Sequence, residues 1–229
     1  MRRGRRGGEL TAGRAAVRPR GWGDARRAVL DNGLTVVTAP APGLHSAMVA
    51  IYVRAGSRHE DASENGVSHF LEHLLFRGSE GFPDSAATNA AVEAAGGNLN
   101  GMTARDHGCY YTPLHPDGLA TGLEVLGDLL RRPLLEDLEV EREIILEEIL
   151  DEVDADGRDI DPDNLSKRII FGAHPLGFKI AGTPAIVRRL TEPEIRAHHA
   201  RHYVGENLVL AVAGPVRRPE VLALADRHL

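Results

Sequence analysis

The chain has 229 residues, of which 42% are apolar but only 4% aromatic, so a core has to be built mainly from Leu, Val, Ile and Ala. Its formal net charge of −6 is unevenly spread, because residues 1–28 carry a net +7 and the remainder therefore −13. The acidic body argues against a nucleic-acid-binding protein, and the lack of an apolar run of about 18 residues argues against a membrane span. The single cysteine, Cys109, excludes an internal disulfide and fits a cytoplasmic location.

We expect residues 1–26 to be an arginine-rich, disordered tail and residues 27–229 to form a single folded domain. The arginines within residues 2–6 could instead contact nucleic acid or an anionic membrane. No apolar stretch follows them, so this segment does not have the pattern of a secretory signal.

The first predicted elements are strands. The stretch RRAVLDNGLTVVTAP alternates apolar and polar residues around Asp31, Asn32 and Gly33, which predicts a β-hairpin with a type I′ turn. In the stretch HSAMVAIYV, residues 45–53, both faces are apolar, so we expect a central strand of its sheet.

Helical and extended patterns then alternate along the chain. The sequence predicts helices at residues 64–76, 84–95, 115–132, 135–153, 165–171, 191–202 and 216–229. It predicts two strands on either side of residues 105–106 and another within residues 206–215, an exposed acidic loop at 154–163 and a Gly/Pro-rich loop at 174–184. Interspersed helices and hairpin-like strand pairs predict an α+β domain, with a mixed or antiparallel sheet packed with helices.

The helix predicted at 64–76 carries the pattern H-x-x-E-H, formed by His69, Glu72 and His73. At about 100° per residue the two histidines share one face, where both imidazoles can reach one metal ion at roughly 2.0–2.1 Å. Glu72 lies between them in angle and is free to take a proton from an attacking water. The order is the inverse of the commoner H-E-x-x-H motif. These five residues alone leave open that the histidines merely form the polar side of a packed helix.

A hydrolytic zinc site needs a third protein ligand and an open position. The helix predicted at 135–153 offers Glu141 and Glu148, which are seven residues apart and therefore share a face, while Ile144, Ile145 and Ile149 pack the helix. Taken alone, the two glutamates are better explained as solvated acids on an acidic helix.

Taken together, H-x-x-E-H and E-x6-E, with 74 residues between His73 and Glu148, resemble the M16 metallopeptidase family. That family includes insulin-degrading enzyme, pitrilysin and the mitochondrial processing peptidase. The likeness runs from about Arg27 to the last residue, through VRAGSRHE, AAGGNLNGMTARDHGCYY, EREIILEEI, HPLGFKIAGT and RHYVGENLVLAVAG in this order. It implies the N-terminal, metal-bearing half of such a peptidase, and the short loops fit the bacterial, processing-peptidase-like branch.

The resemblance also implies roles for single residues. His69, His73 and Glu148 would bind Zn²⁺, Glu72 would be the general base, and Glu141 would orient a ligand from behind.

The resemblance further implies that Asn98 and Asn100 lie on an edge strand beside the metal, where a substrate peptide adds as an extra strand. The alternative is that both asparagines only serve a turn after residues 96–97.

Other residues invite a functional interpretation that we consider weaker. His198, His199 and His202 have spacings that mimic a second metal site, but the family that the chain resembles does not use this segment for metal, so we expect surface or packing roles. We expect Cys109 to be a small core residue rather than a nucleophile, and His174 to be a loop feature.

By its resemblance the chain would be a zinc endopeptidase that hydrolyses extended peptides or precursor segments. Members of the family pair two homologous halves around a chamber, and this chain has the size of one half. We therefore expect a fragment, or a partner that is a homologous half, a separate subunit or a second copy. The alternative is a noncatalytic peptide-binding or assembly subunit, although the intact set of His69, Glu72, His73 and Glu148 favours the enzyme.

Overall fold

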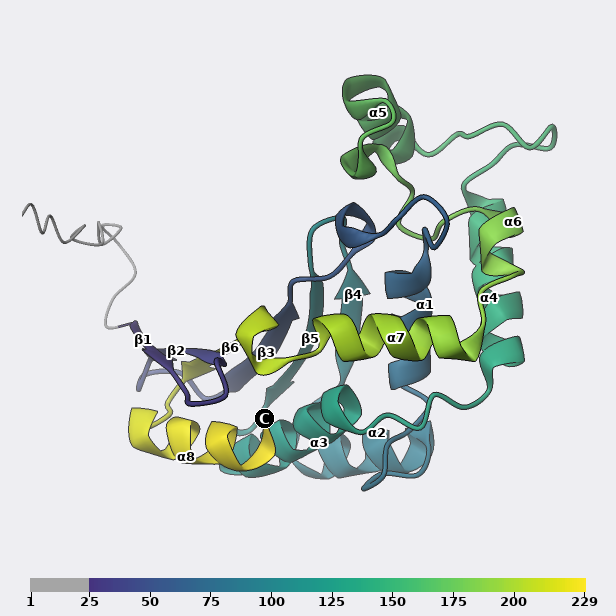
Figure 1. The fold of residues 1–229 in the computed structure, drawn as a ribbon. Helices are drawn as coiled ribbons and strands as arrows, with labels where there is room; N and C mark the ends of the chain where they lie inside the picture. Colours follow the sequence, from purple (N-terminus) through teal and green to yellow (C-terminus); the bar gives the residue numbers. More distant parts are fainter. Residues whose placement is uncertain (1–24) are drawn as a thin grey trace, which may run out of the picture.

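The computed structural model describes residues 25–229, so the expected tail lies outside the described residues except at its end, where Arg26 already belongs to a strand. Six strands form one sheet in the order β1-β2-β6-β3-β5-β4 (Figure 1). The strands are β1 (Arg26–Val29), β2 (Thr35–Pro40), β3 (Ala47–Val53), β4 (Asn100–Thr103), β5 (Gly108–Leu114) and β6 (Leu208–Gly214). Strands β2 and β6 pair in parallel and the other described pairs are antiparallel, which confirms the predicted α+β class with a mixed sheet.

Helices cover one side of this sheet, with α3 and α8 lying side by side below the strands in Figure 1, and α1 and then α4 at the side of β4. The helices are α1 (Val67–Leu75), α2 (Ser85–Ala94), α3 (Leu119–Arg131), α4 (Leu138–Asp151), α5 (Pro162–Phe171), α6 (Pro184–Val187), α7 (Glu192–His202) and α8 (Arg218–His228). The main core joins inward residues of the strands with apolar residues of these helices. No helix among the described residues is both long and apolar enough to cross a membrane.

Strand β3 is central, as predicted, because it pairs with β5 on one edge and β6 on the other. Its two faces differ in environment. Val49, Ile51 and Val53 are fully buried against the helices, whereas Met48 and Tyr52 are 38% and 41% exposed on the opposite face. Burying apolar surface is favourable, so an apolar sheet face left in water is a feature that a function has to explain.

The turn between β1 and β2 is not the predicted type I′ turn. A type I′ turn needs two residues with positive φ, and in residues 31–33 only Gly33 has one, at 88°. The amide of Gly33 donates to Leu30 O, and the amide of Leu30 donates to Leu34 O, as in a three-residue loop with a bulge at glycine. The side-chain Oδ1 of Asn32 accepts from the amide of Leu34 and so stabilises this alternative.

Two further predictions need correction along α4. Helix α4 begins at Leu138 rather than at 135, because Leu135 and Asp137 have positive φ angles of 56° and 59°. Ile144, expected to pack the helix, is 39% exposed.

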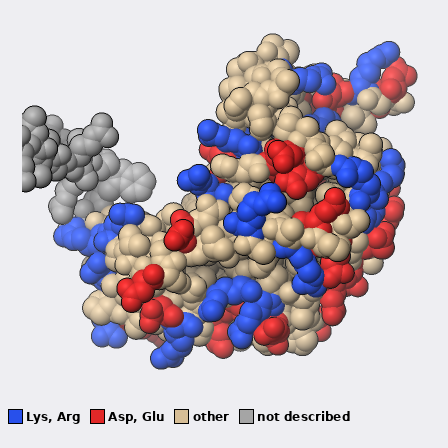
Figure 2. Space-filling model, in the orientation of Figure 1, with Lys and Arg blue, Asp and Glu red and all other residues tan. Residues whose placement is uncertain are grey.

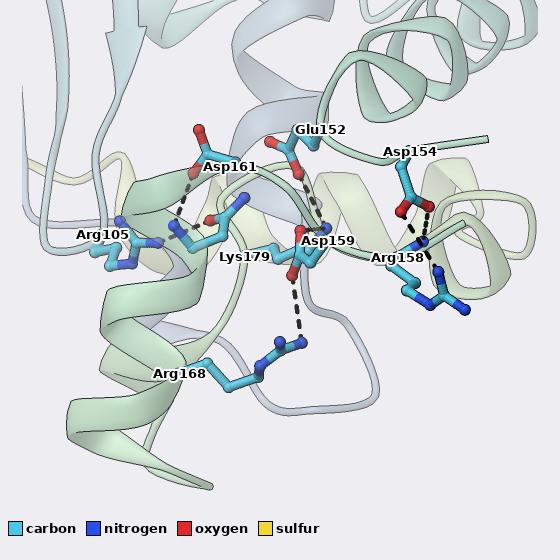
Figure 3. Close-up of polar contacts among 9 residues, drawn as sticks. Arg105, Glu152, Asp154, Arg158, Asp159, Asp161, Arg168 and Lys179 are labelled. Atoms are coloured by element: carbon cyan, nitrogen blue, oxygen red, sulfur yellow. Dashed lines mark hydrogen bonds and ion pairs between the residues drawn. The ribbon is translucent and has the colours of Figure 1, made fainter. Parts of the chain in front are cut away.

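The acidic stretch 154–163 is only partly an exposed loop. Lys179 Nζ lies 2.7 Å from Asp159 Oδ1 and 3.2 Å from Glu152 Oε2, and Arg168 reaches the other oxygen of Asp159 (Figure 3). Asp161 accepts a hydrogen bond from the amide of Asn164, so α5 begins three residues earlier than predicted. The acids are therefore used as helix cap and ion-pair partners, which ties α5 to the end of α4.

Candidate metal centre

Helix α1 is held by its apolar face. Phe70, Leu71 and Leu74 have no exposed surface, while His69 and His73 lie on the opposite side and are 17% exposed. The amphipathic pattern therefore turns both histidines away from the core in a single helical register.

The N-terminus of α1 is fixed by a buried carboxylate from outside the helix. Glu60 accepts hydrogen bonds from the amides of Gly66 and Ser68 at 2.8 and 2.9 Å and from the Asn65 side chain at 2.9 Å. This carboxylate replaces a side-chain cap, since the capping position is Gly66 with φ 101°. A Cβ at Gly66 would lie 2.7 Å from Ala181 O, so the close approach of the chain also requires glycine there.

The structure brings His69 and His73 together with Glu148 of α4. Glu148 Oε2 lies 3.7 Å from His69 Nε2 and 3.5 Å from His73 Nε2, and one possible ligand atom from each residue lies within 4.8 Å of the other two. The imidazole rings stand edge to face with centroids 4.7 Å apart. Within residues 25–229, His69, His73 and Glu148 form the group of His, Cys, Asp and Glu side chains that lie close enough together to bind one metal ion.

The donor set fits a zinc ion. Two imidazole nitrogens and one carboxylate oxygen are the ligands of a catalytic zinc site, with a fourth position left open. Burial, with a smaller contribution from His73, lowers the pKa of His69 to about 4, so this imidazole is neutral and able to bind a metal at neutral pH. Glu148 is 47% exposed, which leaves the site open to solvent on the side of α4.

Glu141 contacts Nδ1 of His73, the ring nitrogen that does not face Glu148. Its Oε2 is 2.8 Å from His73 Nδ1, and its Oε1 accepts a hydrogen bond from Arg77 Nε. A hydrogen bond at Nδ1 selects the tautomer whose Nε2 carries a free lone pair, and Nε2 is the atom that faces Glu148. Glu139, Glu143 and Glu147 are also exposed on α4. Acidic side chains gather along the right edge of the molecule in Figure 2, the side on which Figure 1 labels α4.

Glu72 is held by the edge strand β4. The hydroxyl of Thr103 donates a hydrogen bond to Glu72 Oε2. Burial raises the pKa of the Glu72 carboxyl, while the bond from Thr103 and the nearby His73 oppose that rise. Gly101 makes this approach possible, since a Cβ there would lie 2.6 Å from the Phe76 ring and 3.4 Å from Glu72 Oε1.

The two asparagines differ in position. Asn100 begins β4, the outermost strand next to β5, whereas the exposed Asn98 precedes the strand and is not part of it. The prediction that both lie on an edge strand is therefore wrong for Asn98. Asn100 Nδ2 donates to Asn98 O at 3.2 Å, which is a local turn contact. A role of either residue in substrate binding stays a prediction.

The other candidate residues are buried or hydrogen-bonded elsewhere in the fold and lie outside the metal centre. His198 is 1% exposed with Nε2 3.0 Å from Ser68 Oγ, and His199 Nε2 is 2.8 Å from Leu130 O. His174 accepts from the amide of Leu176 and starts a short turn, and Cys109 is buried in β5. None of these four belongs to the described metal-binding group.

Three residues around the centre were missed by sequence reasoning, namely Glu60, Arg77 and Thr103. Each acts through contacts with α1 or with Glu141 that depend on the folded chain, so no periodic pattern points to it.

Comparisons with known proteins agree with this geometry. Residues 35–183 match the family model described as Insulinase (Peptidase family M16). An uncharacterized zinc protease of Mycobacterium leprae is 37% identical over 234 residues, which cover 100% of this chain and 50% of that protein. Human cytochrome b-c1 complex subunit 1 is 36% identical over 203 residues, 88% of this chain and 42% of that subunit.

The fold is also shared with solved structures. A protease from Helicobacter pylori superposes with a TM-score of 0.83 at 24% identity, over 91% of this chain and 50% of that one. This chain thus spans about half the length of the relatives that it matches.

Proposed function

The chain belongs to peptidase family M16, and we propose that it is the metal-binding half of a zinc-dependent endopeptidase that hydrolyses extended peptides or precursor segments. One observation carries the proposal: His69, His73 and Glu148 converge from two helices, and the Glu72 carboxyl of α1 is near enough to interact electrostatically with His73 and Glu148. The zinc protease of M. leprae, similar over the whole of this chain, supports the choice of metal and reaction.

The residues divide the chemistry between them. His69, His73 and Glu148 would hold the ion, which when bound would act as a Lewis acid on the scissile carbonyl and favour deprotonation of water. Glu72 would take a proton from the attacking water and pass it to the leaving amine. Burial raises the pKa of Glu72, which makes its carboxylate a stronger base for this step.

Strand β4 is the surface that supports the choice of an extended peptide as substrate. It is the outermost strand of the described sheet beyond β5, so its free edge has backbone groups available for pairing with another chain. Thr103 belongs to the same strand and bonds to Glu72, so a peptide added along β4 would pass the general base. Asn98 and Asn100 would contact that peptide at the beginning of the strand.

The open face of the sheet supports a partner. Val209 of β6, Tyr52 of β3 and Met102 of β4 are exposed there, and they share one register row with the buried Cys109 of β5. Because the relatives are about twice as long, the proposed partner is a homologous half, on the same or a separate chain, or a second copy.

A second candidate is a noncatalytic peptide-binding or assembly subunit. The similarity to human cytochrome b-c1 complex subunit 1, whose name describes a component of a complex, favours it. The presence of Glu72 beside a complete set of three ligands favours the peptidase.

The test compares wild type with Glu72→Gln, each combined with the partner half if one is found. We expect about one zinc per chain in both proteins by elemental analysis, and hydrolysis of an unstructured peptide by wild type alone. Metal-free wild type after addition of zinc would refute the site, and equal hydrolysis by both proteins would refute the role of Glu72. Zinc binding without hydrolysis, even with the partner half, would favour the noncatalytic subunit.

A further inference from the structure

The side chain of Arg77 joins the two helices that carry the metal ligands. Arg77 follows the end of α1, where its amide donates to Leu74 O at 3.1 Å. Its guanidinium extends to the first turn of α4, where Nε donates to Glu141 Oε1 and Nη1 lies 3.9 Å from Asp137 Oδ2. The side chain is 27% exposed, so the contact is partly sheltered from solvent.

The Glu141 carboxylate is shared between Arg77 and His73. One oxygen accepts from Arg77, and the other faces His73 Nδ1 at 2.8 Å. The terminal torsion of a glutamate is broad, so a single hydrogen bond leaves the carboxylate free to turn. With both oxygens engaged, it presents a fixed acceptor to the imidazole.

We infer that Arg77 is a positioning residue of the metal centre, which holds the Glu141 carboxylate and thereby the tautomer and ring orientation of His73. The inference rests on the proposed zinc site. The same contact sets the distance between α1 and α4, since Glu141 and Glu148 lie seven residues apart on one face of α4. Arg77 therefore acts on both His73 and Glu148 without touching either the metal or the substrate.

The competing interpretation is an ordinary ion pair that only stabilises the fold, and the chain offers a matched control for it. Arg132 also follows the end of a helix, α3, and binds the buried carboxylate of Asp128. Neither Arg132 nor Asp128 is part of the described metal-binding group. Losing Arg132 removes an arginine–carboxylate pair, here within one helix end, from a place where no ligand depends on it.

The experiment measures the zinc dissociation constant by competition with a chromogenic chelator. We expect Arg77→Met to weaken zinc binding by about 10–100-fold, the usual range for a residue that orients a ligand. Arg77→Lys should recover part of that loss, and Arg132→Met should bind zinc as wild type does. If Arg77 acts through Glu141, the double variant Arg77→Met/Glu141→Gln will bind zinc no more weakly than Glu141→Gln alone.

Three results would overturn the inference: wild-type affinity in Arg77→Met, an equal loss in Arg132→Met, or additive losses in the double variant. Should Arg77→Met fail to fold, Arg77→Gln replaces it, because an amide keeps a donor but not the charge.

A second readout does not need the metal. In metal-free wild type the His73 Nδ1–H bonded to Glu141 should give a protected imidazole proton signal, which Arg77→Met weakens and Arg132→Met leaves unchanged. An unchanged signal in Arg77→Met would contradict the positioning role. If wild type binds no zinc, the proposed metal site fails, whereas this signal still tests Arg77.

Discussion

Thr103, on the edge strand β4, donates its hydroxyl hydrogen bond to the carboxylate of Glu72, on helix α1. The strand on which a peptide is expected to pair and the expected general base are thus in direct contact. A substrate that moves β4 will move the base as well.

Removing this hydroxyl should impair the base and spare the metal. In Thr103→Val the Glu72 carboxylate loses a hydrogen bond that lowers its pKa, so burial raises the pKa of Glu72 further. The acidic limb of the pH profile should therefore move to higher pH, with kcat/KM falling about tenfold, part of the roughly 10²–10⁴-fold that a general base supplies. Zinc content should be unchanged. The control is Thr38→Val, a buried threonine in β2, and an unaltered pH profile in Thr103→Val would contradict the role.

Neighbouring glutamates on α4 allow a sharp test of the third ligand. Glu148 lies 3.5 Å from His73 Nε2, whereas Glu147 is exposed and outside the described metal-binding group. Glu148→Gln should reduce zinc well below one ion per chain, because an amide oxygen is a poorer ligand than a carboxylate. Glu147→Gln should keep the wild-type content by elemental analysis. Loss of zinc in both variants would mean that the charge of α4, rather than one ligand, holds the metal.

The sequence pattern indicated the part of the site that lies on one helix, but not the part contributed by distant segments of the chain. His69 and His73 share a helix face because helical geometry places residues four apart together. Glu148 is 74 residues beyond His73, and only the resemblance to a known family joined them before the structure did. Arg77 could not be found in this way, because its contact depends on where the first turn of α4 lies.

The two incorrect predictions, for the start of α4 and for the turn between β1 and β2, also have physical causes. The start of α4 was misplaced because Leu135 and Asp137 adopt positive φ, which side chains other than glycine rarely do and which no pattern indicates. The type I′ turn was expected from the Asn-Gly pair, yet the Asn32 amide binds Leu229 O and so ties the loop to the far end of the chain. In the second case a tertiary contact accompanies the turn that forms.

The buried His198 should make stability depend on pH. Burial lowers its pKa to about 3, while an unfolded histidine has a pKa near 6.5, so in this range the unfolded state binds a proton that the folded state does not. The free energy of unfolding should therefore rise with pH through the window, by up to roughly 1.4 kcal/mol per pH unit, and level off above it.

The measurement is urea unfolding of the metal-free wild type and of His198→Gln at a series of pH values. In the variant, the glutamine amide can still contact Ser68 Oγ. His69 adds a slope of the same sign, and Glu60, whose pKa burial raises, adds the opposite one. His69 and Glu60 are present in both proteins, so the difference between the two slopes of unfolding free energy against pH is due to His198. Parallel curves would show that His198 titrates normally.

The open sheet face should drive association. Tyr52 is 41% exposed in the middle of that face, so Tyr52→Arg should fold but place a charge where a partner has to bury apolar surface. Studied alone, the wild-type chain should self-associate with rising concentration in sedimentation equilibrium, and Tyr52→Arg should stay monomeric. Ile169→Arg is the control, because Ile169 is 82% exposed but belongs to α5 rather than to the sheet. If Ile169→Arg disrupts association and Tyr52→Arg does not, the partner binds at α5 and the sheet face is not the interface.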